Sequence, residues 1–181
     1  MAVTISQTEA IPAAYPDAPS GLSIEAAAAL DAAVIWQRLE SYVAHRWTAR
    51  GVVWTVEGEG EWTPPLTPAT IETVEVWESY AWTTTTLNPS PLGGFELPGD
   101  GPYRFTGTVG DASPNDVPAA VLEAFRRLAE YSAEVDPMPG TARYEIKLGE
   151  LSETIDRSPT WMARAMQNSG AGDLLRAYRR A

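Results

Sequence analysis

The spacing of apolar residues predicts one helix near the start of the chain and another in its second half. Along residues 23–46, SIEAAAALDAAVIWQRLESYVAHR, apolar side chains recur at intervals of three and four, which predicts one long helix with Ser23 as its N-cap. The same spacing over 117–134, VPAAVLEAFRRLAEYSAE, predicts a second helix. Its buried stripe contains Val121, Leu122, Phe125, Leu128 and Ala129.

Between these helices the pattern changes to the alternation that is typical of strands. Strands are predicted over 52–57, 71–77, 81–87 and 103–109, with a further short one after Gly94. The intervening segments WTPPLTP, NPSPLGG and PGDG are rich in proline and glycine, which indicates connectors and turns. After DPMPG breaks the second helix, residues 144–151 fit either a short strand or an extended linker.

The last residues, WMARAMQNSGAGDLLRAYRRA, predict two short helices. Ser158 and Pro159 are a typical helix start, and Gly170 can take the left-handed conformation that ends the first helix. On the second helix, from about Gly172, Leu174, Leu175 and Tyr178 share one face and three arginines share the other: Arg176, Arg179 and Arg180.

These elements predict an α+β fold. A long N-terminal helix and a second central helix would pack with a small antiparallel β-region, followed by a C-terminal helical tail. Three segments are expected: an extended N-terminal arm over 1–22, a core domain over 23–140, and a linker with the tail over 141–181.

Composition narrows the possible chemistry. There is no cysteine and a single histidine, which excludes disulfides, thiolate sites and a two-histidine metal site within one chain. His45 follows the first predicted helix, where a structural role is favoured over catalysis. The net charge of −11 disfavours a protein that wraps nucleic acid. No segment has the pattern of a membrane span or a secretory signal, so we expect a soluble protein made in the cytoplasm.

No residue pattern indicates an enzyme. Two runs of acids could in principle bind metal or cleave glycosides, but their spacing fits no dedicated metal loop: Glu57, Glu59 and Glu61, then Glu72, Glu75 and Glu78. The glycine pairs precede no helix, so they are not phosphate loops. We therefore expect no catalytic residue, no metal and no cofactor.

Two features leave binding functions open. Four strand tryptophans could stack sugars or bases, although such residues more often fill a core: Trp54, Trp62, Trp77 and Trp82. The tail could pack on its own domain, contact DNA through its arginines, or dock on another protein. Its apolar face, opposite arginine, favours protein docking by a small margin.

The order of several segments resembles a known family. These segments are AHRW, WTPPL, IETVEVW, SPLGGFELP, YRFTGTVG, VPAAVLEAFRRLAEY and the terminal WMARAMQNSGAGDLLRAYRRA. Together they resemble the head–tail connector (adaptor) proteins of long-tailed phages, and particularly the adaptor of alphaproteobacterial gene transfer agents. The resemblance covers roughly residues 23–181, and it does not distinguish a virus from a gene transfer agent.

The resemblance implies a structural protein that forms a dodecameric ring. Such a ring would lie between the portal protein and a stopper or tail terminator protein, at the head–tail interface of a particle assembled in the bacterial cytoplasm. The C-terminal segment, about 157–181, would bind the portal. The implied portal-binding residues are Trp161, Met162, Arg164, Met166, Leu174, Leu175, Arg176, Tyr178, Arg179 and Arg180.

Charge distribution fits this expectation. Five arginines against Asp173 give residues 157–181 a net charge of +4, so the rest of the chain carries −15. A basic tail suits an acidic partner, and acidic channel walls would let DNA pass without specific binding. Glu57, Glu59 and Glu61 are the predicted channel-lining acids, with Glu72, Glu75 and Asp100 as further candidates. The ring flanks are expected around 71–87, 94–109 and the first helix.

Overall fold

The chain divides into two compact units that each contain residues distant in sequence. The computed structural model describes residues 1–111, 117–134, 143–148, 151–156 and 160–179. Unit 1 consists of Met1–Pro16, Val43–Asp116 and Tyr178–Ala181, and unit 2 of Asp17–Tyr42 and Val117–Ala177. The boundaries of these units differ from those of the three segments expected from sequence, 1–22, 23–140 and 141–181. That division into three segments stays a prediction.

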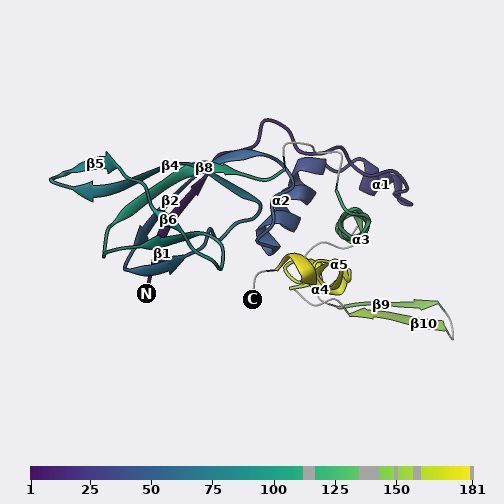
Figure 1. The fold of residues 1–181 in the computed structure, drawn as a ribbon. Helices are drawn as coiled ribbons and strands as arrows, with labels where there is room; N and C mark the ends of the chain where they lie inside the picture. The colour runs from purple at the N-terminus through teal and green to yellow at the C-terminus, as the bar shows by residue number, and fades with distance from the viewer. Residues whose placement is uncertain (112–116, 135–142, 149–150, 157–159, 180–181) are drawn as a thin grey trace. The chain divides into compact units, whose positions relative to one another are not determined.

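Unit 1 is built on a five-stranded antiparallel sheet. Its strand order is β1-β2-β8-β4-β5, so the N-terminal strand lies at one edge (Figure 1). Strand β8 is central, and its alternate residues Tyr103, Phe105 and Val109 are buried. The bounds are Val3–Glu9 for β1, Arg50–Glu57 for β2, Ala69–Glu78 for β4, Ala81–Thr84 for β5 and Tyr103–Val109 for β8.

A smaller three-stranded sheet completes unit 1, in the order β3-β7-β6. Its strands are Gly60–Trp62, Phe95–Leu97 and Asn88–Pro89, respectively. Its aromatic residues pack on the larger sheet, since Trp62 stacks on Phe105 with ring centroids 4.1 Å apart. Trp54 meets the edge of Trp62 at 5.8 Å. The core of unit 1 is therefore aromatic, which explains much of the tryptophan content.

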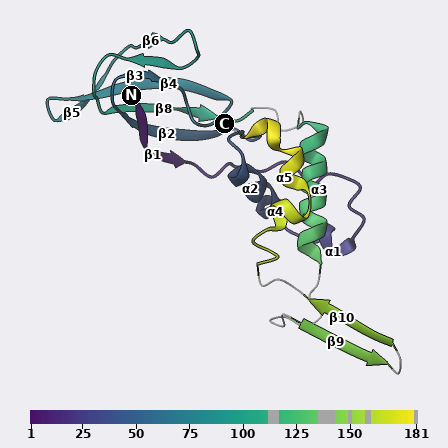
Figure 2. The ribbon, with the colours of Figure 1, turned by 90° about the horizontal axis from the view of Figure 1, so that it is seen from below.

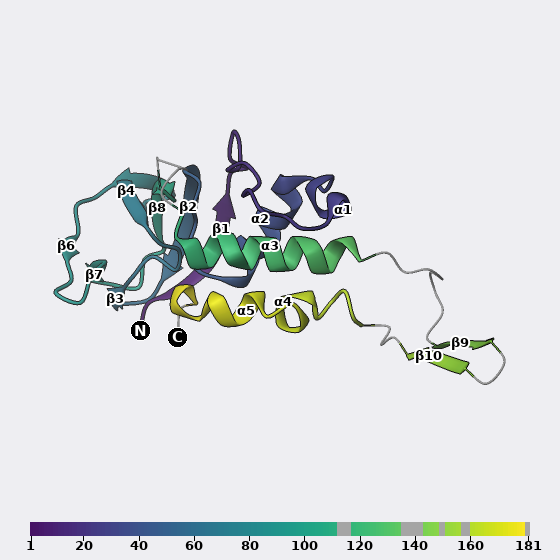
Figure 3. The same ribbon diagram turned by 90° about the vertical axis from the view of Figure 1, so that its right-hand side faces the viewer.

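Unit 2 contains the helices. Helix α3 (Ala119–Ala133) packs against α1 (Glu25–Ala28) and α2 (Ala32–Tyr42), and Phe125 of α3 meets Trp36 of α2 at 5.0 Å. Two short C-terminal helices, α4 (Ala165–Asn168) and α5 (Ala171–Leu174), lie along α3 (Figures 2 and 3). The 3-10 turn η1 (Arg176–Tyr178) follows them, and β9 (Arg143–Leu148) and β10 (Leu151–Asp156) form an antiparallel hairpin.

The long N-terminal helix predicted over 23–46 is wrong. Two helices replace it, because the Asp31 side chain accepts a hydrogen bond from the Ala33 backbone N–H at 2.9 Å and starts a new helix there. The helix ends at Tyr42 because the following backbone pairs with a proline-rich connector instead. Arg46 N–H donates to the Thr67 carbonyl at 2.8 Å, and Thr67 N–H donates to the Ala44 carbonyl at 3.0 Å.

The predicted fold class is therefore wrong. The α+β fold was expected to combine a long N-terminal helix, a small antiparallel β-region and a helical tail. Instead the described structure has extensive antiparallel sheets, helices that are mostly short, and a C-terminal segment of single helical turns. Gly170, at φ 74°, separates α4 from α5, so the glycine predicted to end the first tail helix does end one. Ser158 and Pro159 lie outside the described residues.

Within the described ranges, no helix has the length and apolar character needed to cross a membrane.

Candidate assembly surfaces

The C-terminal segment, residues 160–179, packs largely on its own chain. Met166 and Leu175 are buried, as are the small residues Ala165, Ala171 and Gly172. Gly172 is required by this packing, since a Cβ there would lie 2.9 Å from the Tyr42 hydroxyl. Two of the ten predicted portal-binding residues, Met166 and Leu175, are thus covered in this conformation.

Polar contacts fix the start of this segment within unit 2. Arg38 Nη2 donates to the Met162 carbonyl at 2.9 Å. Asn168 Nδ2 donates to the Tyr131 hydroxyl at 2.9 Å, and the Tyr131 ring lies 5.6 Å from the Trp161 ring. Trp161 and Met162 remain half-buried, as does Leu174, so part of each side chain is available to a partner.

The arginines of the segment are exposed wherever the structure describes them. Arg164, Arg176 and Arg179 are exposed, whereas Arg180 lies outside the described residues. Arg176 Nη2 is 2.9 Å from Asp173 Oδ1, and both side chains are largely solvated, so this ion pair contributes little to stability. The predicted basic residues thus lie at the surface, where they can meet acids of another protein.

Tyr178 belongs to unit 1 and joins an aromatic cluster there. Its ring lies 5.5 Å from His45 and 5.6 Å from Trp47, both edge-on. Its carbonyl accepts a hydrogen bond from the Ala44 N–H at 3.1 Å. His45 Nε2 also lies 3.5 Å from Asp111 Oδ2. These contacts support the structural role that was expected for His45.

The predicted channel acids and the further candidates differ in their polar contacts. Glu57 and Glu59 are exposed beside the turn between β2 and β3, where Gly58 N–H donates to the Asp100 carbonyl at 2.7 Å. Asp100 therefore lies at the same end of unit 1 as Glu57 and Glu59. Glu61 lies further along β3 and accepts a hydrogen bond from Ser90 Oγ at 2.7 Å. Glu75 instead pairs with Arg104 at 2.7 Å.

The strand tryptophans separate into two groups. Trp54 and Trp62 are 0% and 4% exposed, so they are core residues and cannot stack a ligand. Trp77 and Trp82 face each other across the β4–β5 hairpin, with ring centroids 5.3 Å apart. Arg104 lies over the Trp82 ring at 4.5 Å, and the neighbouring Tyr80 is 94% exposed.

An open apolar groove of about 390 Å³ lies elsewhere in unit 1. None of the four strand tryptophans lines this groove. The lining residues are Thr63, Pro64, Leu66, Thr67, Ala69, Ile71, Pro89, Gly94 and Phe95. Across the described residues, no group of histidine, aspartate and glutamate side chains could hold a metal ion.

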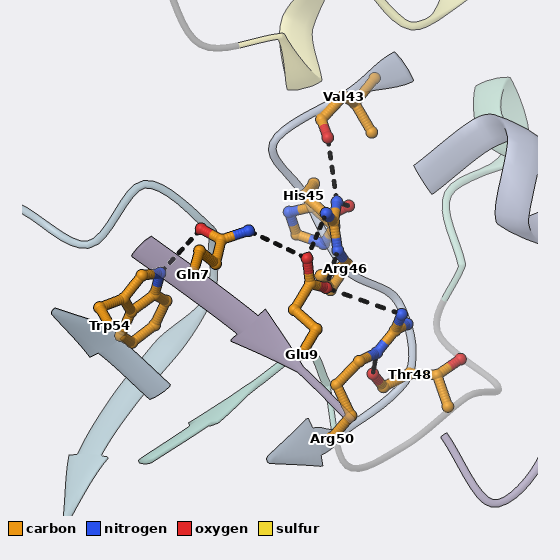
Figure 4. A network of polar contacts seen from close by, with 8 residues as sticks. All are labelled: Gln7, Glu9, Val43, His45, Arg46, Thr48, Arg50 and Trp54. Atoms are coloured by element: carbon orange, nitrogen blue, oxygen red, sulfur yellow. Dashed lines mark hydrogen bonds and ion pairs between the residues drawn. The ribbon is translucent and has the colours of Figure 1, made fainter. Parts of the chain in front are cut away.

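Sequence reasoning missed a polar network that holds strand β1 (Figure 4). Glu9 Oε2 accepts from Arg46 Nε at 2.7 Å and lies 3.9 Å from Arg50 Nη1. Gln7 extends the network, because its Nε2 donates to Glu9 at 3.0 Å while its Oε1 accepts from Trp54 Nε1 at 2.8 Å. The weak alternation in VTISQTE was the available signal, but the surrounding prolines favoured an irregular arm.

The network determines the charge state of Glu9. Burial raises the pKa of its carboxyl group, but the hydrogen bond and charge of Arg46, the charge of Arg50 and the hydrogen bond from Gln7 together outweigh burial. The pKa of Glu9 therefore lies below its ordinary value of 4.5. A charged Glu9 is the form that holds the two arginines.

Comparisons with known proteins give structural likeness alone. No family model matches the chain, and no curated protein matches it. A chain in the virion of a native gene transfer agent particle is similar over 83% of this chain and 75% of its own length, with 16% identity and a TM-score of 0.54. A chain in the neck of an empty gene transfer agent particle, computed with C6 symmetry, is similar over 91% and 95%, with 16% identity and a TM-score of 0.51. At this identity, the likeness means that these chains share a fold.

Proposed function

We propose that this chain is a structural component of the neck of a gene transfer agent or tailed phage. In this proposal it is a head–tail adaptor that forms a ring between the portal and the stopper or tail terminator ring, and it has no catalytic activity. The single observation that carries the proposal is the fold shared with chains of gene transfer agent particles, one of which belongs to the neck. The segment order that resembles adaptor proteins supports it independently.

The portal contact is proposed for the exposed side of the C-terminal segment. Arg164, Arg176 and Arg179 provide the charge, and the half-buried Trp161, Met162 and Leu174 provide apolar contact. Aromatic residues and arginine are enriched at binding hot spots. Met166 and Leu175 are buried against their own chain, so they could contact a portal only if the segment detached. In the proposed complex the segment stays packed, and these two residues stabilise its conformation.

The ring itself is proposed from the six-fold symmetry of the neck in which the second similar chain was solved. Identical subunits in a ring meet through two different flanks. Twelve is the number of subunits that the family resemblance implies. Glu57 and Glu59, the acids beside the β2–β3 turn of unit 1, are proposed to line the channel. Their negative charge would repel the phosphates of DNA and keep DNA from binding the wall.

The test is co-sedimentation of the purified chain with its portal. Deleting residues 157–181 also removes the buried Met166 and Leu175, so a loss of binding would be ambiguous on its own. We therefore choose Arg164→Glu combined with Arg176→Glu, two exposed changes that leave this packing intact. Lys147→Glu, in β9, is the control for a basic residue lost outside the segment.

We expect the unmodified chain and Lys147→Glu to decorate the portal as a ring. The double variant should bind at least about tenfold more weakly, since charge reversal removes attraction and adds repulsion. Binding by neither the full chain nor the control would contradict the adaptor proposal. Equal binding by all three would leave the ring but place the portal contact elsewhere.

A further inference from the structure

Residues 1–16, called the arm from here on, pack in unit 1. The chain that follows them directly belongs to unit 2. The chain passes from unit 1 to unit 2 between Pro16 and Asp17, and it returns to unit 1 only at Val43. The arm's covalent link is therefore to unit 2, while strand β1 lies on β2 of unit 1. A segment arranged in this way can complete the sheet of its own copy or of another copy.

The site that receives the arm requires a partner of defined chemistry. Three buried donors point at it, and each ends on an arm residue. Trp62 Nε1 donates to Thr4 Oγ1 at 2.9 Å and Trp54 Nε1 donates to Gln7 Oε1 at 2.8 Å. Arg46, which is 8% exposed, donates to Glu9. Without the arm the two indole N–H groups would lose these acceptors, and Arg46 would lose Glu9 while keeping its bonds to the Val43 and His45 carbonyls. The site therefore favours this strand over an arbitrary one.

The arm itself contributes little apolar burial. Apart from Ala2 and Pro12, its side chains are exposed or half-buried, and Val3 and Ile5 are 53% and 60% exposed. Its attachment rests on backbone pairing with β2 and on the three polar contacts. Those interactions are the same whichever copy supplies the strand, so exchange leaves the bonding within the sheet unchanged.

The link after the arm is short and stiff. Tyr15 lies under the Arg50 guanidinium in unit 1, at 5.6 Å. Only a few residues later, in unit 2, the Ser20 carbonyl accepts from Arg126 Nε at 2.7 Å and Ser23 N–H donates to Glu130 at 2.8 Å. Pro16 and Pro19 lie between these anchors, and proline favours extended linkers. Short links are known to favour exchange of elements between identical subunits.

We propose that in the assembled ring each arm completes the five-stranded sheet of the neighbouring copy. The occupant of the β2 edge is then β1 of a second copy of this chain. Each subunit donates its arm on one side and receives an arm on the other, as head-to-tail contacts in a closed ring require. This inference rests on the proposed ring; in a chain with no neighbouring copy the arm lies on its own sheet.

Because the chain lacks cysteine, engineered pairs report the arrangement without background from the chain's own thiols. Thr8 and Val53 are directly opposite in the β1–β2 register. Opposed strand residues have Cα separations that a disulfide can span. Thr8→Cys and Val53→Cys chains are mixed in equal amounts, assembled on the portal, oxidised, and separated on a non-reducing gel. Val3→Cys mixed with Glu57→Cys is a second opposed pair, at two exposed positions.

The control mixes Val53→Cys with Thr106→Cys, which are opposed in β2 and β8, two strands that are not exchanged. Exchange predicts a covalent dimer from both arm pairs, at about a quarter of the interfaces if copies mix randomly, and none from the control. Rings that form without this dimer, while a Thr8→Cys, Val53→Cys double variant closes its disulfide within one chain, would overturn exchange and leave the proposed function standing.

Failure of any ring to form on the portal would instead contradict the proposed function. The same mixtures are then oxidised at high concentration without portal. A dimer specific to the arm pairs would support exchange by itself, and its absence there would overturn exchange as well.

Discussion

At the scale of single residues, Glu9 is the charged group on which strand β1 depends most. Its carboxylate joins the strand to Arg46, and the low pKa of Glu9 means that folding favours its charged form. A group with a lowered pKa in the folded state adds stability above its ordinary pKa of 4.5, and that stability is lost as the pH falls through the lower, folded value.

Glu9→Gln should therefore destabilise the chain at pH 7 and reduce its sensitivity to acid below about pH 4.5. The loss at pH 7 should be about 1–2 kcal/mol, because Arg46 loses a charged partner in a mostly buried site. Denaturant unfolding at pH 7 and pH 3.5 measures both effects. Glu78→Gln, at an exposed position of β4, is the control. An unchanged acid dependence in Glu9→Gln would mean that other carboxylates dominate it.

At the scale of elements, the close approach of β4 to β8 depends on a glycine. A Cβ at Gly107 would lie 2.1 Å from the Thr70 carbonyl oxygen, which is a backbone atom. The β4–β8 register shifts between Ile71 and Thr73, opposite this glycine. The bulge and the glycine therefore belong together: the backbone of β4 occupies the space that a side chain would need.

Gly107→Ala should destabilise the chain by about 2–3 kcal/mol, since the strands must separate to admit a methyl group. Gly51→Ala is the matched control, because Gly51 is also a strand glycine and a Cβ there meets nothing within 4 Å. That control should be neutral or slightly stabilising. Thermal unfolding of both variants measures the difference, and equal melting temperatures would show that β4 can shift without cost.

Elements with strong internal patterns were predictable from sequence. The alternation in 103–109 gave strand β8, and the apolar stripe over 117–134 gave α3. Elements whose existence or length depends on backbone pairing with another segment were not predictable. Strand β1 exists because β2 pairs with it, and the first helix stops at Tyr42 because residues 44–46 pair with Thr67. Single-residue events, such as the Asp31 cap, were visible in the sequence but were outweighed by the apolar spacing around them.

For the candidate surfaces, too, features set by the local pattern could be predicted and features set by packing partners could not. The exposure of Arg176 and Arg179 agrees with their predicted placement opposite an apolar face. The burial of Met166 and Leu175 could not be deduced, because an apolar face predicts burial without saying against which chain. The strand tryptophans present the same difficulty: Trp54 fills the core while Trp77 reaches solvent, although both lie in alternating segments.

At the scale of the whole molecule, charge is unevenly distributed. Residues 157–181 carry a net charge of +4, and the rest of the chain carries −15. If Glu57 and Glu59 line a channel, replacing both by lysine in every subunit adds positive charge where phosphates pass. Such particles should deliver DNA more slowly while their rings still form. Glu25→Lys, at an exposed position of α1 in unit 2, is the control for the change of charge.

The measurement is the amount of DNA transferred over time per particle that carries a ring. Acidic channel walls would be supported by slower transfer when Glu57 and Glu59 are replaced by lysine, together with unchanged transfer for Glu25→Lys. Equal rates for both would assign Glu57 and Glu59 to another surface.

The strand order of unit 1 also has a consequence for synthesis on the ribosome. β1 is made first, but the central strand β8 ends only at Val109. At translation rates of about 5–20 residues per second, roughly 5–20 s pass between the two. During that interval β1 and β2 can form at most a two-stranded ribbon, which is marginally stable in water. In the proposed exchange, the arm therefore joins its own sheet or that of another copy only after β8 has been translated.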